Sequence, residues 1–176
     1  MKVLKYLGII AFAAILGVTA FIYSGIYPMG ADVPHNKLTY WLLETLREQS
    51  IARVSRDIVV PPLDNPDLLL SGGADYNEMC SVCHLRPGIL KSDMSLGLYP
   101  IPQNLSQTQN GHGNHEHDDS DQVARRQFWI IKHGIKASGM LAWGLTHDDQ
   151  RIWAMVAFLQ KLPQLTPDQY QILTAR

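Results

Sequence analysis

The longest apolar run lies at the start of the chain. From Tyr6 to Tyr27 there are 22 consecutive residues without a charged side chain. As an α-helix this run is about 33 Å long, enough to cross the hydrocarbon core of a bilayer. A signal sequence is the alternative, with a small-residue cleavage site near Ala20, but the apolar run continues through Phe21 beyond that point. The pattern therefore favours an uncleaved transmembrane anchor over residues 1–28.

A second, amphipathic helix is predicted from Asn36, a suitable N-cap residue, to about Asp57. One stripe of this helix carries Leu38, Trp41, Leu42, Leu46 and Gln49. Three destinations for the stripe remain open, namely packing on its own domain, docking on a partner subunit, or lying at the bilayer surface. The proline-rich residues 60–66 follow as a stiff connector, so residues 29–70 are predicted to be a linker with one amphipathic helix.

The pattern beyond residue 71 is helical and lacks a strand-rich βαβ unit. One helix is expected to start near Ser120 or Asp121 and to end at Gly134. Another is expected from Thr146, which with Asp149 resembles a capping box, to about residue 162. The prediction is an all-α domain over residues 71–163.

A short final helix is predicted for residues 164–176. Thr166 and Gln169 have capping-box spacing, and Pro167 occupies the first helical position. We expect this helix to run through Leu173 and to pack on the domain before it.

The charged residues on either side of the apolar run predict how the chain is oriented in the membrane. The net charge of −1 excludes a strongly basic nucleic-acid binder. Lys2 and Lys5 precede the apolar run, whereas only Lys37, offset by Asp32, follows it closely. The positive-inside rule then places the rest of the chain outside the cytoplasm.

The candidate chemistry is concentrated in residues 80–84. The two cysteines of the chain, Cys80 and Cys83, are followed directly by His84, which is the C-x-x-C-H attachment signature for a c-type haem. The two thiols would each add to a haem vinyl group, while His84 reaches the iron as an axial ligand. The spacing predicts one covalently bound haem c, whose attachment takes place on the side of the membrane that the charge pattern indicates.

Two other readings of the cysteines stay open. A zinc site would borrow further ligands from the polar, His-rich residues 110–121, which contain His112, His115 and His117. A redox dithiol is the second reading. Residues 110–121 are themselves either a solvated surface insertion or a separate metal site.

Around this motif the chain resembles the class I monohaem c-type cytochromes, in their membrane-anchored bacterial form. Gly72 and Tyr76 lie eight and four residues before Cys80. The resemblance implies that Gly72 lets the N-terminal helix cross closely over the C-terminal one, and that Tyr76 packs against Phe158 or Trp153. It also implies that a proline carbonyl, from Pro100 or Pro102, accepts a hydrogen bond from the iron-bound histidine.

A sixth iron ligand is expected from the loop before the C-terminal helix. Met140 fits by location, and Gly139-Met140 followed by Trp143 resembles the methionine loop of the family, with Leu141 where proline is common. Met94 and Met155 are alternative sulfur ligands, and His133 and His147 are alternative nitrogen ligands. The resemblance implies His84 and Met140 as the axial pair.

Together these features predict an electron carrier or electron-transfer subunit rather than an enzyme. It would relay electrons between a periplasmic or membrane dehydrogenase and a respiratory acceptor, with redox proteins as partners. It would cross the bacterial cytoplasmic membrane once and hold its haem domain on the periplasmic side. A haem peroxidase or gas sensor with an open sixth position, and a zinc-binding module, are the alternative functions.

Overall fold

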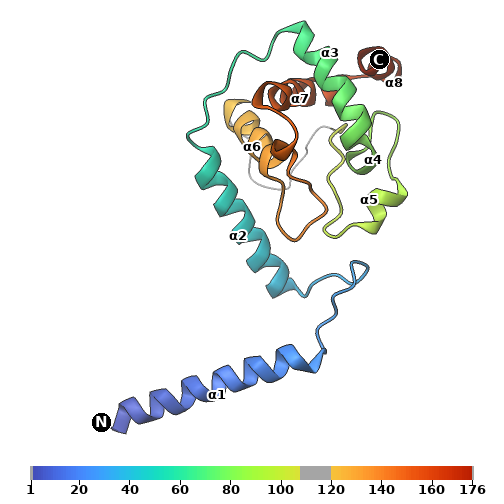
Figure 1. Cartoon of the computed structure of the whole chain (residues 1–176). Helices are drawn as coiled ribbons and strands as arrows, with labels where there is room; N and C mark the ends of the chain where they lie inside the picture. The colour runs from blue at the N-terminus through green and yellow to red at the C-terminus, as the bar shows by residue number, and fades with distance from the viewer. Residues whose placement is uncertain (1, 108–119, 176) are drawn as a thin grey trace. The chain divides into compact units, whose positions relative to one another are not determined.

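A computed structural model of the protein describes residues 2–107 and 120–175. The chain divides into two compact units, Met1–Val33 and Pro34–Arg176. The first unit holds helix α1, Lys2–Ser24, drawn in dark blue in Figure 1. Its length and apolar composition suffice for a membrane span, a test that a signal sequence also passes. Helix α1 is thus compatible with the predicted anchor.

The second unit begins with helix α2, Lys37–Ser55. The side chain of Asn36 accepts a hydrogen bond from the Thr39 amide at 2.9 Å, which confirms the predicted N-cap. The C-terminal half of α2 packs on helix α6, with Ile51 and Ser55 buried and Glu48 paired with Arg126. This half of the amphipathic helix therefore packs on its own domain.

One nearly continuous helical segment carries the C-x-x-C-H motif. Helix α3, Pro66–Asp75, passes into a π-helical turn, Tyr76–Cys80, and then into helix α4, Ser81–His84. Helix α3 crosses helix α7, Asp149–Lys161, at Gly72, where a β-carbon would lie 2.0 Å from the carbonyl oxygen of Ala154. The close crossing implied by the resemblance is present, and only glycine fits there.

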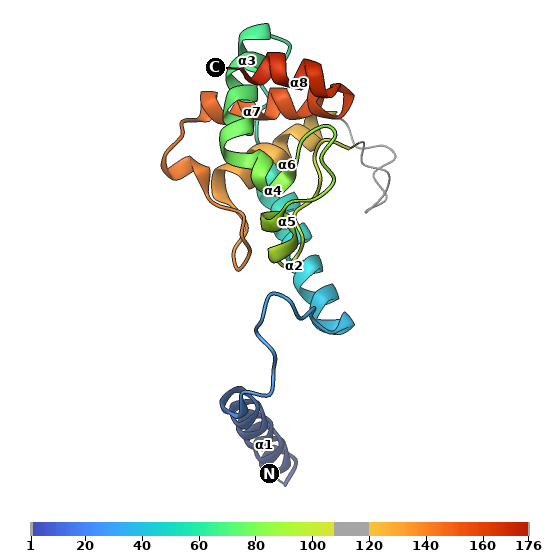
Figure 2. The same ribbon diagram turned by 90° about the vertical axis from the view of Figure 1, so that its right-hand side faces the viewer.

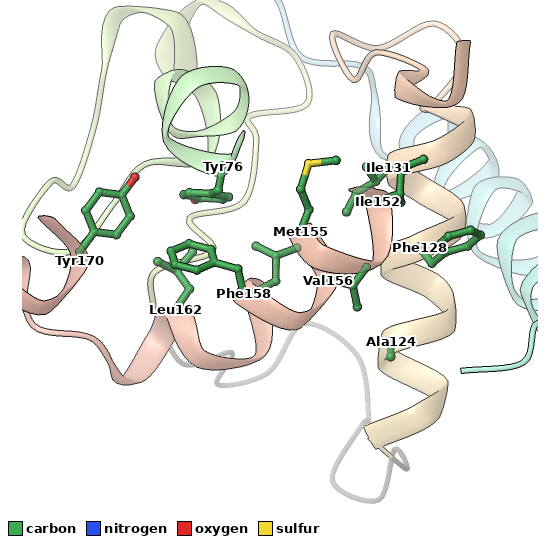
Figure 3. Packing of buried hydrophobic residues seen from close by; sticks show 11 residues of the cluster. Tyr76, Ala124, Phe128, Ile131, Ile152, Met155, Val156, Phe158, Leu162 and Tyr170 are labelled. Atoms are coloured by element: carbon green, nitrogen blue, oxygen red, sulfur yellow. The ribbon is translucent and has the colours of Figure 1, made fainter. Parts of the chain in front are cut away.

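Aromatic side chains fill the space beside this crossing. The ring centroids of Tyr76 and Phe158 lie 5.5 Å apart, and Tyr170 contacts both rings. Figure 3 shows these three rings on the α3 side of the core. Trp153 instead stacks on Phe128 of α6, with centroids 4.1 Å apart. Of the two residues expected against Tyr76, the structure has Phe158.

The remaining helices close the domain. Helix α6 runs over Ser120–His133 and ends at Gly134, whose φ of 66° is typical of a C-terminal glycine. Helix α8, Pro167–Thr174, has the predicted capping box between Thr166 and Gln169. The views in Figures 1 and 2 show α3, α7 and α8 together at one end of the domain. The described residues contain helices and no strand, so the all-α prediction is confirmed.

Two local predictions differ from the structure. Helix α7 is capped by Asp148, whose carboxylate accepts from the Arg151 amide at 2.8 Å, so the capping box assigned to Thr146 is wrong. The hydroxyl of Thr146 instead lies 2.8 Å from Nδ1 of His147. A short helix α5, Asp93–Gly97, was not predicted; it is capped by Ser92.

Candidate haem site

The three residues of the attachment motif share one turn of helix. Cys80 ends the π-helical turn, and Cys83 and His84 lie in α4. Residues three and four positions apart lie on the same side of a helix, so both thiols and the imidazole face one region. Both thiols are free and partly buried, as is His84. The segment therefore presents two sulfur atoms and one ring nitrogen together, as covalent haem attachment requires.

The ring of His84 is held by a main-chain acceptor. Its Nδ1 lies 2.9 Å from the carbonyl oxygen of Gln103. Because a carbonyl only accepts, Nδ1 carries the proton and Nε2 keeps its lone pair for a metal. Burial lowers the pKa of His84, although the bond to Gln103 opposes this, and a lower pKa favours the neutral, ligating form. The acceptor was expected to be the carbonyl of Pro100 or Pro102. That prediction is wrong, because the acceptor is the carbonyl of Gln103, one to three residues later.

The backbone beside His84 is also fixed from the core. The hydroxyl of Tyr76 donates to the carbonyl of Leu85 at 2.6 Å. Leu85 has a φ of 65° and a ψ of −177°, a backbone conformation that is rare outside glycine, and it ends α4. The amide of Leu105 donates to the carbonyl of His84 at 3.1 Å. His84 is thus supported from Tyr76 in the π-helical turn on one side and from residues 103–105 on the other.

Met140 lies on a closed loop between α6 and α7. The Ile135 amide donates to the Met140 carbonyl at 3.2 Å and closes the loop. A β-carbon on Gly139 would lie 2.7 Å from the Leu98 side chain, so the loop touches the segment that leads to Gln103. Met140 is partly buried and packs against the core. This contact brings the methionine loop to the chain segment that orients His84.

The other candidate ligands differ in their surroundings. Met94 on α5 is 54 % exposed, and Met155 on α7 is 1 % exposed within the core. His133 is exposed at the end of α6. Nε2 of His147 is buried without a hydrogen-bond partner, while its Nδ1 faces Thr146. Met140 alone among the three methionines combines a loop position with partial burial.

The site does not resemble that of a redox dithiol. Burial, together with the nearby Asp75, raises the pKa of the Cys80 thiol to about 12. Catalytic dithiols need a thiolate near neutral pH, and therefore a lowered pKa. Among residues 2–107 and 120–175, no group of three His, Cys, Asp or Glu side chains is arranged to hold a metal ion. The predicted loop ligands His112, His115 and His117 lie outside the described residues.

Comparison with known families agrees with this geometry. Residues 67–159, more than half of the chain, match the family described as cytochrome c oxidase, cbb3-type, subunit III. The chain belongs to this family of c-type cytochromes. No curated protein and no solved structure gave a match. The matched residues run from the start of α3 almost to the end of α7, so the cytochrome domain includes both Cys80 and Met140.

The cytochrome domain supplies donors that suit a haem c. Two free thiols, a neutral imidazole with Nε2 available and a thioether on a supported loop match the attachment and axial ligands of such a group. The sequence did not indicate Gln103 because this residue contributes a backbone carbonyl, which every residue type has. It also missed the support of Leu85 by Tyr76, which was predicted only as an aromatic core residue.

Proposed function

We propose that this cytochrome is a membrane-anchored electron-transfer protein with one haem c. In this proposal Cys80 and Cys83 hold the haem through thioether bonds, and His84 and Met140 are its axial ligands. A c-type cytochrome domain supports haem-based electron transfer in general. The haem, when bound, supplies an iron centre that takes up and releases one electron.

The observation that carries the proposal is the hydrogen bond between Nδ1 of His84 and the carbonyl of Gln103. This bond selects the tautomer that leaves Nε2 free, and it fixes the rotation of the ring. Iron ligation by His84 then needs no change of tautomer. A thioether from Met140 as the second ligand would raise the reduction potential above that of a bis-histidine haem.

The partners and the location belong to the same proposal. Helix α1 supports a single-pass anchor, and Lys2 and Lys5 before it support a periplasmic cytochrome domain. We propose that the protein relays electrons from a dehydrogenase to a respiratory acceptor. The family description names an oxidase subunit, which supports a respiratory acceptor. Tethering near one partner would raise its effective concentration, to the order of mM for a short flexible link.

The test is a visible spectrum of the oxidised and reduced protein together with a pyridine haemochrome assay. One haem c per chain, retained through denaturing electrophoresis, is the expected result. A Cys80→Ala, Cys83→Ala double variant should lose the haem stain from the protein band. Zinc without iron in the purified protein would overturn the proposal in favour of the zinc module.

A further inference from the structure

The N-terminal end of α2 is an apolar surface that the cytochrome domain leaves uncovered. Figures 1 and 2 both show this end projecting past the helices of the domain. Its large side chains are 40–71 % exposed. We call these five residues the collar: Leu38, Tyr40, Trp41, Leu42 and Leu43. The described chain covers each of them only in part.

The collar surrounds the helix instead of forming one stripe. At 100° per residue, Leu38, Tyr40, Trp41, Leu42 and Leu43 are spread around the whole circumference of α2. Residues 38–43 contain no charged side chain. A folded partner would cover one side of such a helix and leave the other apolar side in water. A lipid environment would cover every side, so the collar fits a bilayer better than a protein surface.

The collar also ends abruptly. Charged Lys37 precedes it and charged Glu44 follows it. On the outward face Leu46 is the last apolar residue before the exposed Gln49 and Arg53. Five residues of rise correspond to about 8 Å, which is close to the 5–10 Å depth of insertion at the headgroup boundary. Tyr and Trp are also the residues enriched at membrane interfaces.

The chain keeps this end of α2 within reach of the proposed anchor. Only residues 25–36 separate α1 from α2. Fully extended, these twelve residues would span at most about 40 Å, and the Val33 amide bonds the Gly30 carbonyl in a turn that shortens them. An anchored α1 therefore holds the collar close to the same bilayer.

We infer that the collar inserts into the headgroup region of the bilayer that α1 crosses. The inference rests on the proposed anchoring of α1. Because the C-terminal half of α2 packs on α6, insertion of the collar would hold the cytochrome domain at the membrane surface and limit its reorientation.

The test measures thiol accessibility in the full-length haem-loaded protein in phosphatidylcholine–phosphatidylglycerol vesicles. Leu42→Cys and Arg53→Cys are each treated with a charged, water-soluble maleimide. The two positions lie about 20° apart around the same helix, so they differ in place along α2 and not in face. Position 42 should react several-fold more slowly than position 53, at every protein-to-lipid ratio. A Leu38→Cys variant should react as slowly as Leu42→Cys.

Equal rates at positions 42 and 53 would overturn the inference. Slow reaction at position 42 that disappears on dilution with lipid would also overturn it, and would indicate contact between copies of the chain. Vesicle flotation tests the anchor on the same samples, and protein that fails to float refutes both the anchor and the inserted collar. The wild-type protein reports separately on the haem, because Cys80 and Cys83 react with maleimide only if no thioether bonds were formed.

Discussion

A β-carbon on Gly72 would lie 2.0 Å from the carbonyl oxygen of Ala154. This is a clash with backbone, so neither helix can relieve it by moving a side chain. Gly72→Ala should lower the free energy of unfolding by about 1–3 kcal/mol or more, as overpacking of a close contact does. Thermal unfolding of the haem-loaded protein measures the loss. Gly97→Ala is the control, because no heavy atom lies within 4 Å of its β-carbon. Equal melting temperatures for the two variants would contradict the close crossing.

Removing the Tyr76 hydroxyl should disturb His84 through the backbone, because this hydroxyl lies 2.6 Å from the Leu85 carbonyl and 3.2 Å from the His84 carbonyl. Tyr76→Phe leaves the carbonyl of Leu85 without its donor, which should cost about 1–3 kcal/mol. Because Leu85 follows His84 directly, we also expect a shift in the reduction potential of the haem. Tyr170→Phe is the matched control, since its hydroxyl contacts Asn77 instead. A potential that shifts equally in both variants would argue against a positioning role for Tyr76.

Replacing Met140 should open the iron to an external ligand. In the proposed site Met140→Ala removes the thioether, so the reduced protein should bind carbon monoxide fully while the wild type resists it. The visible spectrum before and after addition of the gas gives the result. Met94→Ala, at an exposed position on α5, should behave as the wild type. Full binding by the wild type would instead support a sensor or peroxidase with an open sixth position.

Acid should loosen the contact between α2 and α6. Burial raises the pKa of Glu48, but Arg126 and Arg47 more than offset this and leave the pKa lowered. The ionised carboxylate therefore stabilises the folded state above its unfolded pKa of about 4.3, and this contribution disappears as the pH falls through the lower folded pKa. The protection of α2 amides against hydrogen exchange, corrected for the intrinsic pH dependence of exchange, should fall over that acidic range.

Glu48→Gln should already show the lower protection at neutral pH, with little further change in protection on acidification. Asp64→Asn, at an exposed position in the connector, is the control and should leave α2 exchange unchanged at neutral pH. If Glu48→Gln exchanges as slowly as the wild type, the ion pair with Arg126 does not hold α2 on the domain.

Local signals predicted most of the helices. Asn36 and Thr166 cap their helices as expected because a cap requires one side chain and an amide two or three residues later. The same locality explains the error at α7, where Thr146 and Asp148 are both suitable caps two residues apart and the structure has Asp148. Helix α5 was not predicted because the third position of its capping box is Ser95 and not the usual Glu or Gln.

The candidate site was predictable only as far as residue type allowed. Cys80, Cys83 and His84 are contiguous, so their spacing carries their chemistry directly. The sequence could not predict what α2 packs against, because an amphipathic pattern indicates which face is apolar and not what covers it. The structure separates the two halves of that helix, one packed through Ile51 and the other exposed at Trp41.

The acceptor for His84 has a consequence for how substitutions in this protein are interpreted. Because the carbonyl of Gln103 belongs to the main chain, replacing its side chain leaves the hydrogen bond intact. A mutational scan would score position 103 as tolerant, although the atom that orients the imidazole is located there. The haem site depends on the path of the backbone from residue 98 to residue 105. Insertions and deletions in this segment should therefore impair the haem site, whereas point substitutions should not.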